Sequence, residues 1–281
     1  MTRPIDIFRP GRSFPAVSVT GTRCDLKCHH CAGRYLHGMR AATEPEELLR
    51  LARGLDEEGA LGLLISGGSE TTGKVPLERF VGTIGQIKDT TRLKINAHVG
   101  LAPRSDLEGL VAAGVDVFSV DVYGTDSAVQ DTLGLDARAA DFMKVVEDLK
   151  DLGAPAVAPH ICIGIEKGVL AGEMDAIARL KPTGPDVLVF IVFTPTKGTS
   201  YETAQPPAPS DILSVLRLAR EQLPDTRLVL GCMRPRTARR YELEAVALGI
   251  DGIVMPSKET LNHIRRSGAK ISEKGTCCAL G

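Results

Sequence analysis

Short apolar, β-branched segments recur about every 25 to 35 residues along the chain, and each is followed by a stretch with helical periodicity. The eight segments are PAVSVTG, LGLLISGG, LKINAHVG, DVFSVDVYG, VAPHICIGI, VLVFIVFTP, RLVLGC and DGIVMPS. The helical stretches cover residues 45–58, 76–88, 106–113, 137–152, 172–180, 210–222, 238–248 and 258–267. Many strands are apolar on both faces, which is typical of parallel strands that are covered by helices on the outside and by packed side chains inside the barrel. The pattern predicts an α/β fold, a full or nearly full eightfold βα barrel of the TIM type, with a doubly wound open sheet as the second choice.

The length of 281 residues suits one such barrel. We expect a single domain over residues 1–281, with an N-terminal extension at 1–14, the barrel at 15–268 and a tail at 269–281 that closes over the barrel mouth. A net charge of −1 gives no sign of a nucleic-acid or membrane surface. No stretch approaches the ~18 apolar residues of a membrane span, and the first residues lack a signal-peptide pattern, so we expect a cytoplasmic protein.

Polar residues and glycines gather where the predicted strands end. In a βα barrel this rim carries the functional site. The residues concerned are Ser66, Gly67, Gly68, Asn96, Asp121, Gly164, Thr194 and Cys232.

Three cysteines, Cys24, Cys28 and Cys31, lie in the loop after the first predicted strand. The chain has seven cysteines, an odd number that does not suggest a disulfide framework, so metal binding or catalysis is the better interpretation. Nearby Arg23 and Lys27 favour thiolates. Structural zinc usually takes four protein ligands, whereas three thiols with one open position suit an iron-sulfur cluster.

The CxxxCxxC spacing in VTGTRCDLKCHHCAG, placed after the first strand of a βα barrel, resembles the radical S-adenosylmethionine (SAM) superfamily. The resemblance implies a [4Fe-4S] cluster on Cys24, Cys28 and Cys31. It also implies that SAM chelates the free iron and is cleaved to a 5'-deoxyadenosyl radical. His30 stands where the superfamily often has an aromatic residue near the adenine; it either stacks in the same way or is an ordinary loop histidine.

Other segments resemble SAM-binding elements of the same superfamily. ISGGSE is similar to the GGE motif, which assigns the SAM amino group to the backbone of Ser66, Gly67 and Gly68. HICIGIEKGVLAGE is similar to GxIxGxxE, in which an isoleucine presses on the adenine. Asp121 accepts the ribose hydroxyls by this resemblance, or belongs to a polar layer inside the barrel. The remaining SAM residues expected are Asn96, Ile163 or Ile165, and Thr194.

Four cysteines remain once the loop is accounted for. Cys162 lies in the fifth predicted strand and is either a core residue or a further metal ligand. Cys232 follows the seventh strand, and Cys277 and Cys278 form a vicinal pair on the tail. If the tail folds back to meet Cys232, these three residues hold a second iron-sulfur cluster opposite the first. The alternative is a redox-active or merely exposed tail.

The segments VSVTGTRCDLKCHHCAGRYL and LGCMRPR, with the vicinal pair, resemble the biotin and lipoyl synthase-like members, closest to the two-component archaeal-type lipoyl synthases. The resemblance implies sulfur insertion into an octanoyl-lysine on a lipoyl carrier domain, with Cys232, Cys277 and Cys278 holding the sulfur-donating cluster. It also implies a paralogous radical SAM partner subunit and a flavodoxin or ferredoxin as electron donor. The alternatives are a biotin synthase or methylornithine synthase type of enzyme, and a non-enzymatic metal or cluster carrier.

Overall fold

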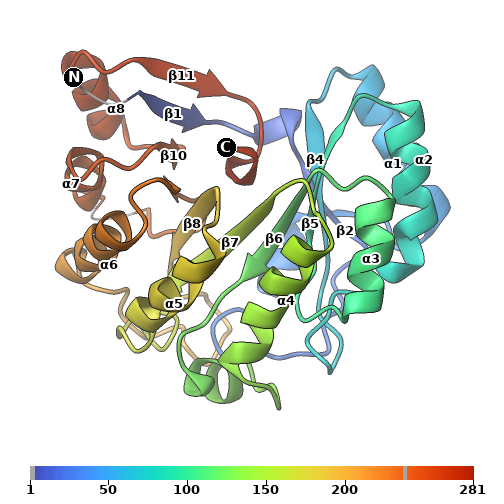
Figure 1. The fold of residues 1–281 in the computed structure, drawn as a ribbon, viewed down its shortest axis with the longest axis horizontal. Coiled ribbons are helices and arrows are strands. Elements are labelled where there is room, and N and C mark those ends of the chain that lie inside the picture. Colours follow the sequence, from blue (N-terminus) through green and yellow to red (C-terminus); the bar gives the residue numbers. More distant parts are fainter. Residues whose placement is uncertain (1–3, 237–238) are drawn as a thin grey trace.

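A computed structural model describes residues 4–236 and 239–281 of the chain. Parallel strands form one curled sheet whose outer face is covered by helices (Figure 1). The strands are β1 Ile5–Phe8, β2 Ala16–Ser18, β3 Arg40–Ala41, β4 Gly62–Ser66, β5 Lys94–His98, β6 Val117–Asp121, β7 Val157–Ile163, β8 Val187–Val192, β9 Arg227–Leu230, β10 Gly252–Val254 and β11 Ile271–Lys274. The helices are α1 Pro45–Glu57, α2 Val81–Thr90, α3 Arg104–Ala112, α4 Ala139–Asp151, α5 Glu173–Leu180, α6 Pro209–Gln222, α7 Tyr241–Ala247 and α8 Lys258–Arg266.

The sheet has 11 strands in the order β11-β1-β10-β9-β8-β7-β6-β5-β4-β2-β3. Its central strands, β2 and β4 to β10, are the eight predicted from the sequence, and they lie side by side in chain order. This arrangement confirms the barrel-type α/β fold. The sheet remains open between β3 and β11, because β1 pairs with β10 where strand β2 would close a barrel. No helix in the described residues has the length and apolarity needed to cross a bilayer.

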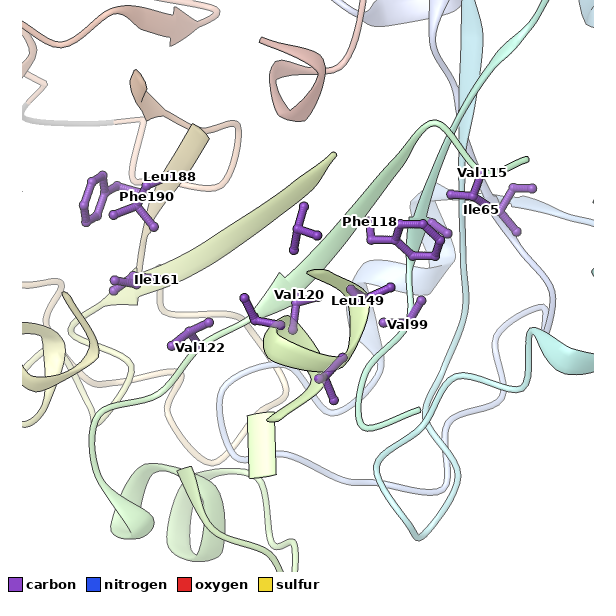
Figure 2. Close-up of a cluster of buried hydrophobic side chains, with 14 of the residues drawn as sticks. Ile65, Val99, Val115, Phe118, Val120, Val122, Leu149, Ile161, Leu188 and Phe190 are labelled. Carbon is purple, nitrogen blue, oxygen red and sulfur yellow. The ribbon is translucent and has the colours of Figure 1, made fainter. Parts of the chain in front are cut away.

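Alternation along each strand separates two environments. One set of side chains packs between the sheet and the helices; it includes Phe118 and Val120 of β6, Ile161 of β7 and Leu149 of α4 (Figure 2). The residues between them in the sequence face the concave side, and there polar groups accumulate. The apolar outer layer packs the strands against the helices, and the concave face carries the polar side chains that a functional site needs.

Sequence signals fix several helix starts. Pro45 begins α1, where a missing N–H costs nothing, and the Glu47 side chain accepts the Thr43 and Glu44 N–H groups at 2.9 and 3.3 Å. The Ser257 hydroxyl accepts the Thr260 N–H at 3.1 Å before α8. Helix α2 begins at Val81, later than predicted, because a 3-10 turn over Glu78–Phe80 precedes it. The first residue of the predicted helix 238–248 lies outside the described residues.

Both chain ends join the sheet. Strand β1 comes from the predicted N-terminal extension, and β11 comes from the predicted tail. After β11, Gly275 lies against Leu61 and Ser13, which precede β4 and β2, so the tail bridges the open gap. A final 3-10 turn over Cys278–Leu280 then enters the curve of the sheet (Figure 1).

The C-terminal turn closes the barrel at the amino ends of the strands. Cys278 and Ala279 pack against Val117 and Val187, the first residues of β6 and β8, and also against Phe8, Ala158, Val189, Val229 and Val254. The cysteine loop follows β2, at the carboxyl ends of the strands. The tail therefore lies at the opposite end of the interior from the cysteine loop.

Candidate functional site

The cysteine loop is folded as a tight turn that gathers ligand atoms. The N–H groups of Cys31 and Ala32 donate to the carbonyl of Cys28 at 3.2 and 2.9 Å, and Ala32 and Gly33 take left-handed backbone angles. This turn brings one ligand atom each of Cys28, His30 and Cys31 within 4.8 Å of one another. Cys24 stands beside them, with its sulfur 3.1 Å from the carbonyl of Leu26.

The glycines that follow β4 support this loop directly. The Gly68 N–H donates to the Thr20 hydroxyl at 2.7 Å, and that hydroxyl donates to the Arg23 carbonyl at 2.8 Å. A Cβ atom on Gly68 would stand 2.0 Å from the Arg23 carbonyl oxygen and 2.6 Å from the Cα of Cys24. Only glycine permits this approach. Ser66, Gly67 and Gly68 are thus adjacent to the cysteine loop, and their contact with SAM stays a prediction.

The thiols of the loop interact strongly with one another. A hydrogen bond from Cys28 lowers the pKa of Cys31 to about 4, and His30 adds to this effect. The same bond, together with burial, raises the pKa of Cys28, and burial raises the pKa of Cys24. These shifts favour a thiolate on Cys31 and oppose thiolates on Cys28 and Cys24, so a bound cation would be needed to deprotonate all three. Three thiols with a buried, unpartnered imidazole Nδ1 of His30 fit an iron-sulfur cluster with one position beyond the cysteines.

A clamp of aromatic contacts fixes the outer side of the cysteine loop. His29 stacks on Tyr201 of the long loop after β8, with ring centroids 5.4 Å apart, and the Tyr201 N–H donates to the His29 carbonyl. The Tyr201 hydroxyl lies 3.2 Å from that of Thr132, and the Lys167 ammonium lies 5.4 Å from its ring centroid. The loops after β2, β6, β7 and β8 are thereby tied together.

A polar group occupies the inner face of β5, β6 and β7. His98 Nε2 lies 3.1 Å from a carboxylate oxygen of Asp121, and the ring of His160 is 6.3 Å from that of His98. Asp121 raises the pKa of His98 against the effect of burial, whereas burial lowers the pKa of His160 to about 4. The side chains of His98 and Asp121 remain 31% and 32% exposed, so this level of the interior is open.

Ile163 and Ile165, the two alternatives for the adenine contact, lie in different environments. Ile163 is fully buried in the core between sheet and helices, so its expected contact with the adenine is wrong. Ile165 instead packs with Cys28 and Tyr123, beside the cysteine loop. Glu173 shapes this segment by accepting the Gly164 N–H at 2.6 Å, along with two further backbone N–H groups.

Cys162 and Thr194 lie at the rim. Cys162 faces inward and packs near Cys31, and burial raises its pKa, with Asp121 and Glu173 adding to the shift. The Thr194 hydroxyl donates to the carbonyl of Val192 at 3.2 Å. Both residues are close to the end of the interior that carries the cysteine loop.

Cys277 and Cys278 lie near enough to Cys232 for their charges to affect its thiol, although the three sulfurs do not lie within 4.8 Å of one another. A hydrogen bond with Cys278 lowers the pKa of Cys277 to about 7, and the same bond raises the pKa of Cys278. Burial raises the pKa of Cys232, and the Cys277 thiolate raises it further. Cys232 is exposed. We call these three residues the tail thiol set.

Asn96 contacts the tail thiol set, through Cys277. Its side-chain amide donates to the Cys277 sulfur at 3.5 Å and accepts from the Ser119 hydroxyl at 2.9 Å. Asn96 is only 1% exposed. The structure thus gives it a partner on the tail, where the sequence pointed to SAM.

A buried ion pair holds the segment that carries Cys232. Arg234 donates to the carbonyls of Gly231 and Val254 and pairs with Glu242 at 2.9 Å. Glu242 also accepts from Arg239, from the Ser257 N–H and from the Thr260 hydroxyl. The end of β9 is therefore fixed to β10, α7 and α8.

Sequence reasoning missed two features of the site. The roles of His29 and Tyr201 were not predicted, because a ring stack between two distant loops leaves no periodic signal. The His98–Asp121 pair was within reach: alternation places both on inner faces of neighbouring strands, but the pattern does not fix the relative height of the two strands.

Comparison with known proteins gives consistent matches. A family model described as the radical SAM superfamily matches residues 18–167, just over half of the chain. A biotin synthase of Clostridium acetobutylicum is 21% identical over 258 residues, covering 88% of this chain and 76% of that protein. A biotin synthase of Desulforudis audaxviator is 26% identical over 246 residues, covering 85% and 73%.

Solved structures share the fold. HydG, a maturase of the [FeFe]-hydrogenase, aligns with a TM-score of 0.68 and 17% identity, covering 96% of this chain. The chain spans 64% of the length of that maturase. Methylornithine synthase (PylB) aligns with a TM-score of 0.62 and 16% identity, covering 96% of this chain and 84% of that one.

Proposed function

The chain belongs to the radical SAM superfamily, and from this premise we propose that it is a sulfur-inserting enzyme of the biotin and lipoyl synthase kind. The observation that carries the proposal is the tail thiol set. Cys277 and Cys278 lie at the opposite end of the interior from the cysteine loop, and Cys232 follows β9 within electrostatic reach of them, an arrangement that suits a second metal centre.

Each part of the interior has a role in this proposal. When bound, the loop cluster with SAM supplies a radical that removes hydrogen from an unactivated carbon, and an auxiliary cluster supplies sulfur. Cys24, Cys28 and Cys31 hold the first group, and the tail thiol set holds the second. The Asn96 amide orients the Cys277 sulfur. The Arg234–Glu242 pair keeps Cys232 in reach of the tail.

For the substrate we propose an octanoyl-lysine on a lipoyl carrier domain, acted on together with a paralogous partner subunit. The cysteine pattern supports an acyl substrate, because it resembles the two-component lipoyl synthases. Each C–S bond replaces a C–H bond whose hydrogen leaves with 5'-deoxyadenosine. A flavodoxin or ferredoxin supplies the electrons for SAM cleavage.

A second candidate is a biotin synthase type of reaction on a small molecule. It is favoured by the curated relatives, which are biotin synthases, and by the polar pair His98–Asp121 at the carboxyl ends of β5 and β6. A ureido-type group would find donors and acceptors there.

The two candidates are separated by anaerobic assay of reconstituted protein with dithionite and SAM. One reaction receives an octanoyl-lysyl peptide with the candidate partner subunit, and the other receives dethiobiotin. The lipoyl proposal expects thiolated peptide and no biotin. Release of 5'-deoxyadenosine without thiolation of the peptide would overturn it, and biotin formation would support the second candidate.

Iron and sulfide analysis tests the auxiliary cluster. We expect about eight irons per chain in the wild type and about four in a Cys277→Ser, Cys278→Ser double variant. Cys162→Ser serves as the matched control, since Cys162 lies apart from the tail thiol set, and should keep eight. Four irons in the wild-type protein would contradict the auxiliary cluster while leaving SAM cleavage intact.

A further inference from the structure

The side chains of the neighbouring residues His29 and His30 point in different directions. The turn at Cys28 directs His29 outward onto the ring of Tyr201, and His29 is exposed. His30 is directed to the other side, where its ligand nitrogen lies within 4.8 Å of the Cys28 and Cys31 sulfurs. His30 also contributes to the lowering of the pKa of Asp121, so it lies toward the interior.

The Nδ1 atom of His30 is buried and has no hydrogen-bond partner among the described residues, although the imidazole ring does hydrogen-bond Cys31. Leaving a buried polar nitrogen unpaired costs about 1–3 kcal/mol, so native proteins rarely retain one without a use. An imidazole nitrogen is a good ligand for iron, and histidines replace cysteines on one iron of some clusters.

We propose that His30 is an exchangeable fourth ligand of the metal centre on Cys24, Cys28 and Cys31. Its imidazole occupies the position beyond the cysteines before SAM binds, and SAM displaces it. The inference rests on the proposed cluster. The exchange breaks one Fe–N bond of the neutral imidazole as the SAM amino and carboxylate groups bind, so no electron moves and no proton is needed.

This ligand competes with SAM. If the imidazole is bound in nine of every ten molecules, the apparent Kd for SAM rises by roughly tenfold over that of the open centre. In return, the cluster is shielded while no SAM is present. The protein thus keeps its iron protected and requires SAM to open the centre.

Pulsed electron paramagnetic resonance on reduced, reconstituted protein containing 15N-histidine tests the inference. Wild-type protein without SAM should show a hyperfine coupling from one imidazole nitrogen, and SAM should abolish it. The His30→Phe variant, which installs an aromatic residue at this position, should lack the coupling. The His29→Phe variant is the matched control, because it keeps a ring against Tyr201 while removing the neighbouring imidazole, and it should retain the coupling.

SAM binding gives a second readout. We expect His30→Phe to lower the apparent Kd for SAM at least threefold and His29→Phe to leave it unchanged. A wild-type cluster without nitrogen coupling, or a coupling that persists in His30→Phe, would overturn the inference alone. A wild-type preparation that holds no four-iron cluster would overturn the proposed cluster, and this inference with it.

Discussion

Gly68 is the residue on which the cysteine loop depends most closely. A methyl group there meets the Arg23 carbonyl and the Cys24 backbone, neither of which is a flexible side-chain end. We expect Gly68→Ala to displace the loop, to destabilise the protein by about 1–3 kcal/mol and to reduce iron content and SAM cleavage more than tenfold. Gly67→Ala is the control, since its Cβ meets only the Val19 and Thr20 side chains at 3.1 Å or more. Wild-type iron content in Gly68→Ala would contradict this dependence.

The His98–Asp121 pair makes the interior sensitive to pH. Because the pKa of His98 is raised and that of Asp121 is lowered, the pair is charged between these two values. Its stabilising effect is complete below about pH 6.5, the ordinary value of histidine, and disappears as pH rises through the raised pKa of His98. Protonation of Asp121 removes the effect at the acidic end.

Asp121→Asn removes the charge that holds His98 protonated. We expect the pKa of His98 to fall to or below its ordinary value, because burial alone lowers it. NMR titration of 15N-histidine in the metal-free protein measures this directly. Asp126→Asn, which removes a carboxylate that bonds the Ala139 N–H, is the control and should leave His98 unchanged. An unaltered His98 pKa in Asp121→Asn would show that another group sets it.

At the scale of elements, Glu242 joins β9, β10, α7 and α8 through one buried carboxylate. Neutralising it in Glu242→Gln leaves the Arg234 guanidinium, 3% exposed, without a counter-charge. We expect a loss of roughly 3–5 kcal/mol in the free energy of unfolding, measured by urea denaturation. Glu273→Gln, which affects only exposed pairs with Arg9 and Arg265, should cost less than about 1 kcal/mol. Similar losses in both variants would mean that burial of the pair is unimportant.

Secondary structure was predictable wherever the pattern was long. The eight apolar segments all became strands, since each is an apolar run bounded by glycine, proline or polar residues and followed by a helical pattern. Strands β1, β3 and β11 were not predicted, because they owe their conformation to pairing with partners far away in sequence. Ile163 was misplaced for a related reason: a motif match does not say which face of the strand a residue takes.

For the whole molecule, the decisive feature is the path of the tail, which no local pattern specifies. From the sequence, Cys277 and Cys278 are expected to meet Cys232 if the tail folds back, and the structure places the pair within electrostatic reach of Cys232. It also places the tail at the amino ends of the strands, where Cys278 and Ala279 are 5% and 1% exposed. The tail thus supplies two thiols and also closes the interior at the amino ends of the strands. These two roles can be separated experimentally.

Deleting residues 276–281 removes both roles, whereas Cys277→Ser with Cys278→Ser removes only the thiols. The deletion leaves Val189, Val229 and other apolar side chains facing water, so we expect it to cost about 2–4 kcal/mol and to lower the melting temperature by several degrees. The double variant should cost less than half as much. Both should lose the iron bound by the tail thiol set and keep about four irons on the cysteine loop. Calorimetry and iron analysis together check this expectation. Equal melting temperatures for the deletion and the double variant would mean that the tail contributes thiols without closing the barrel.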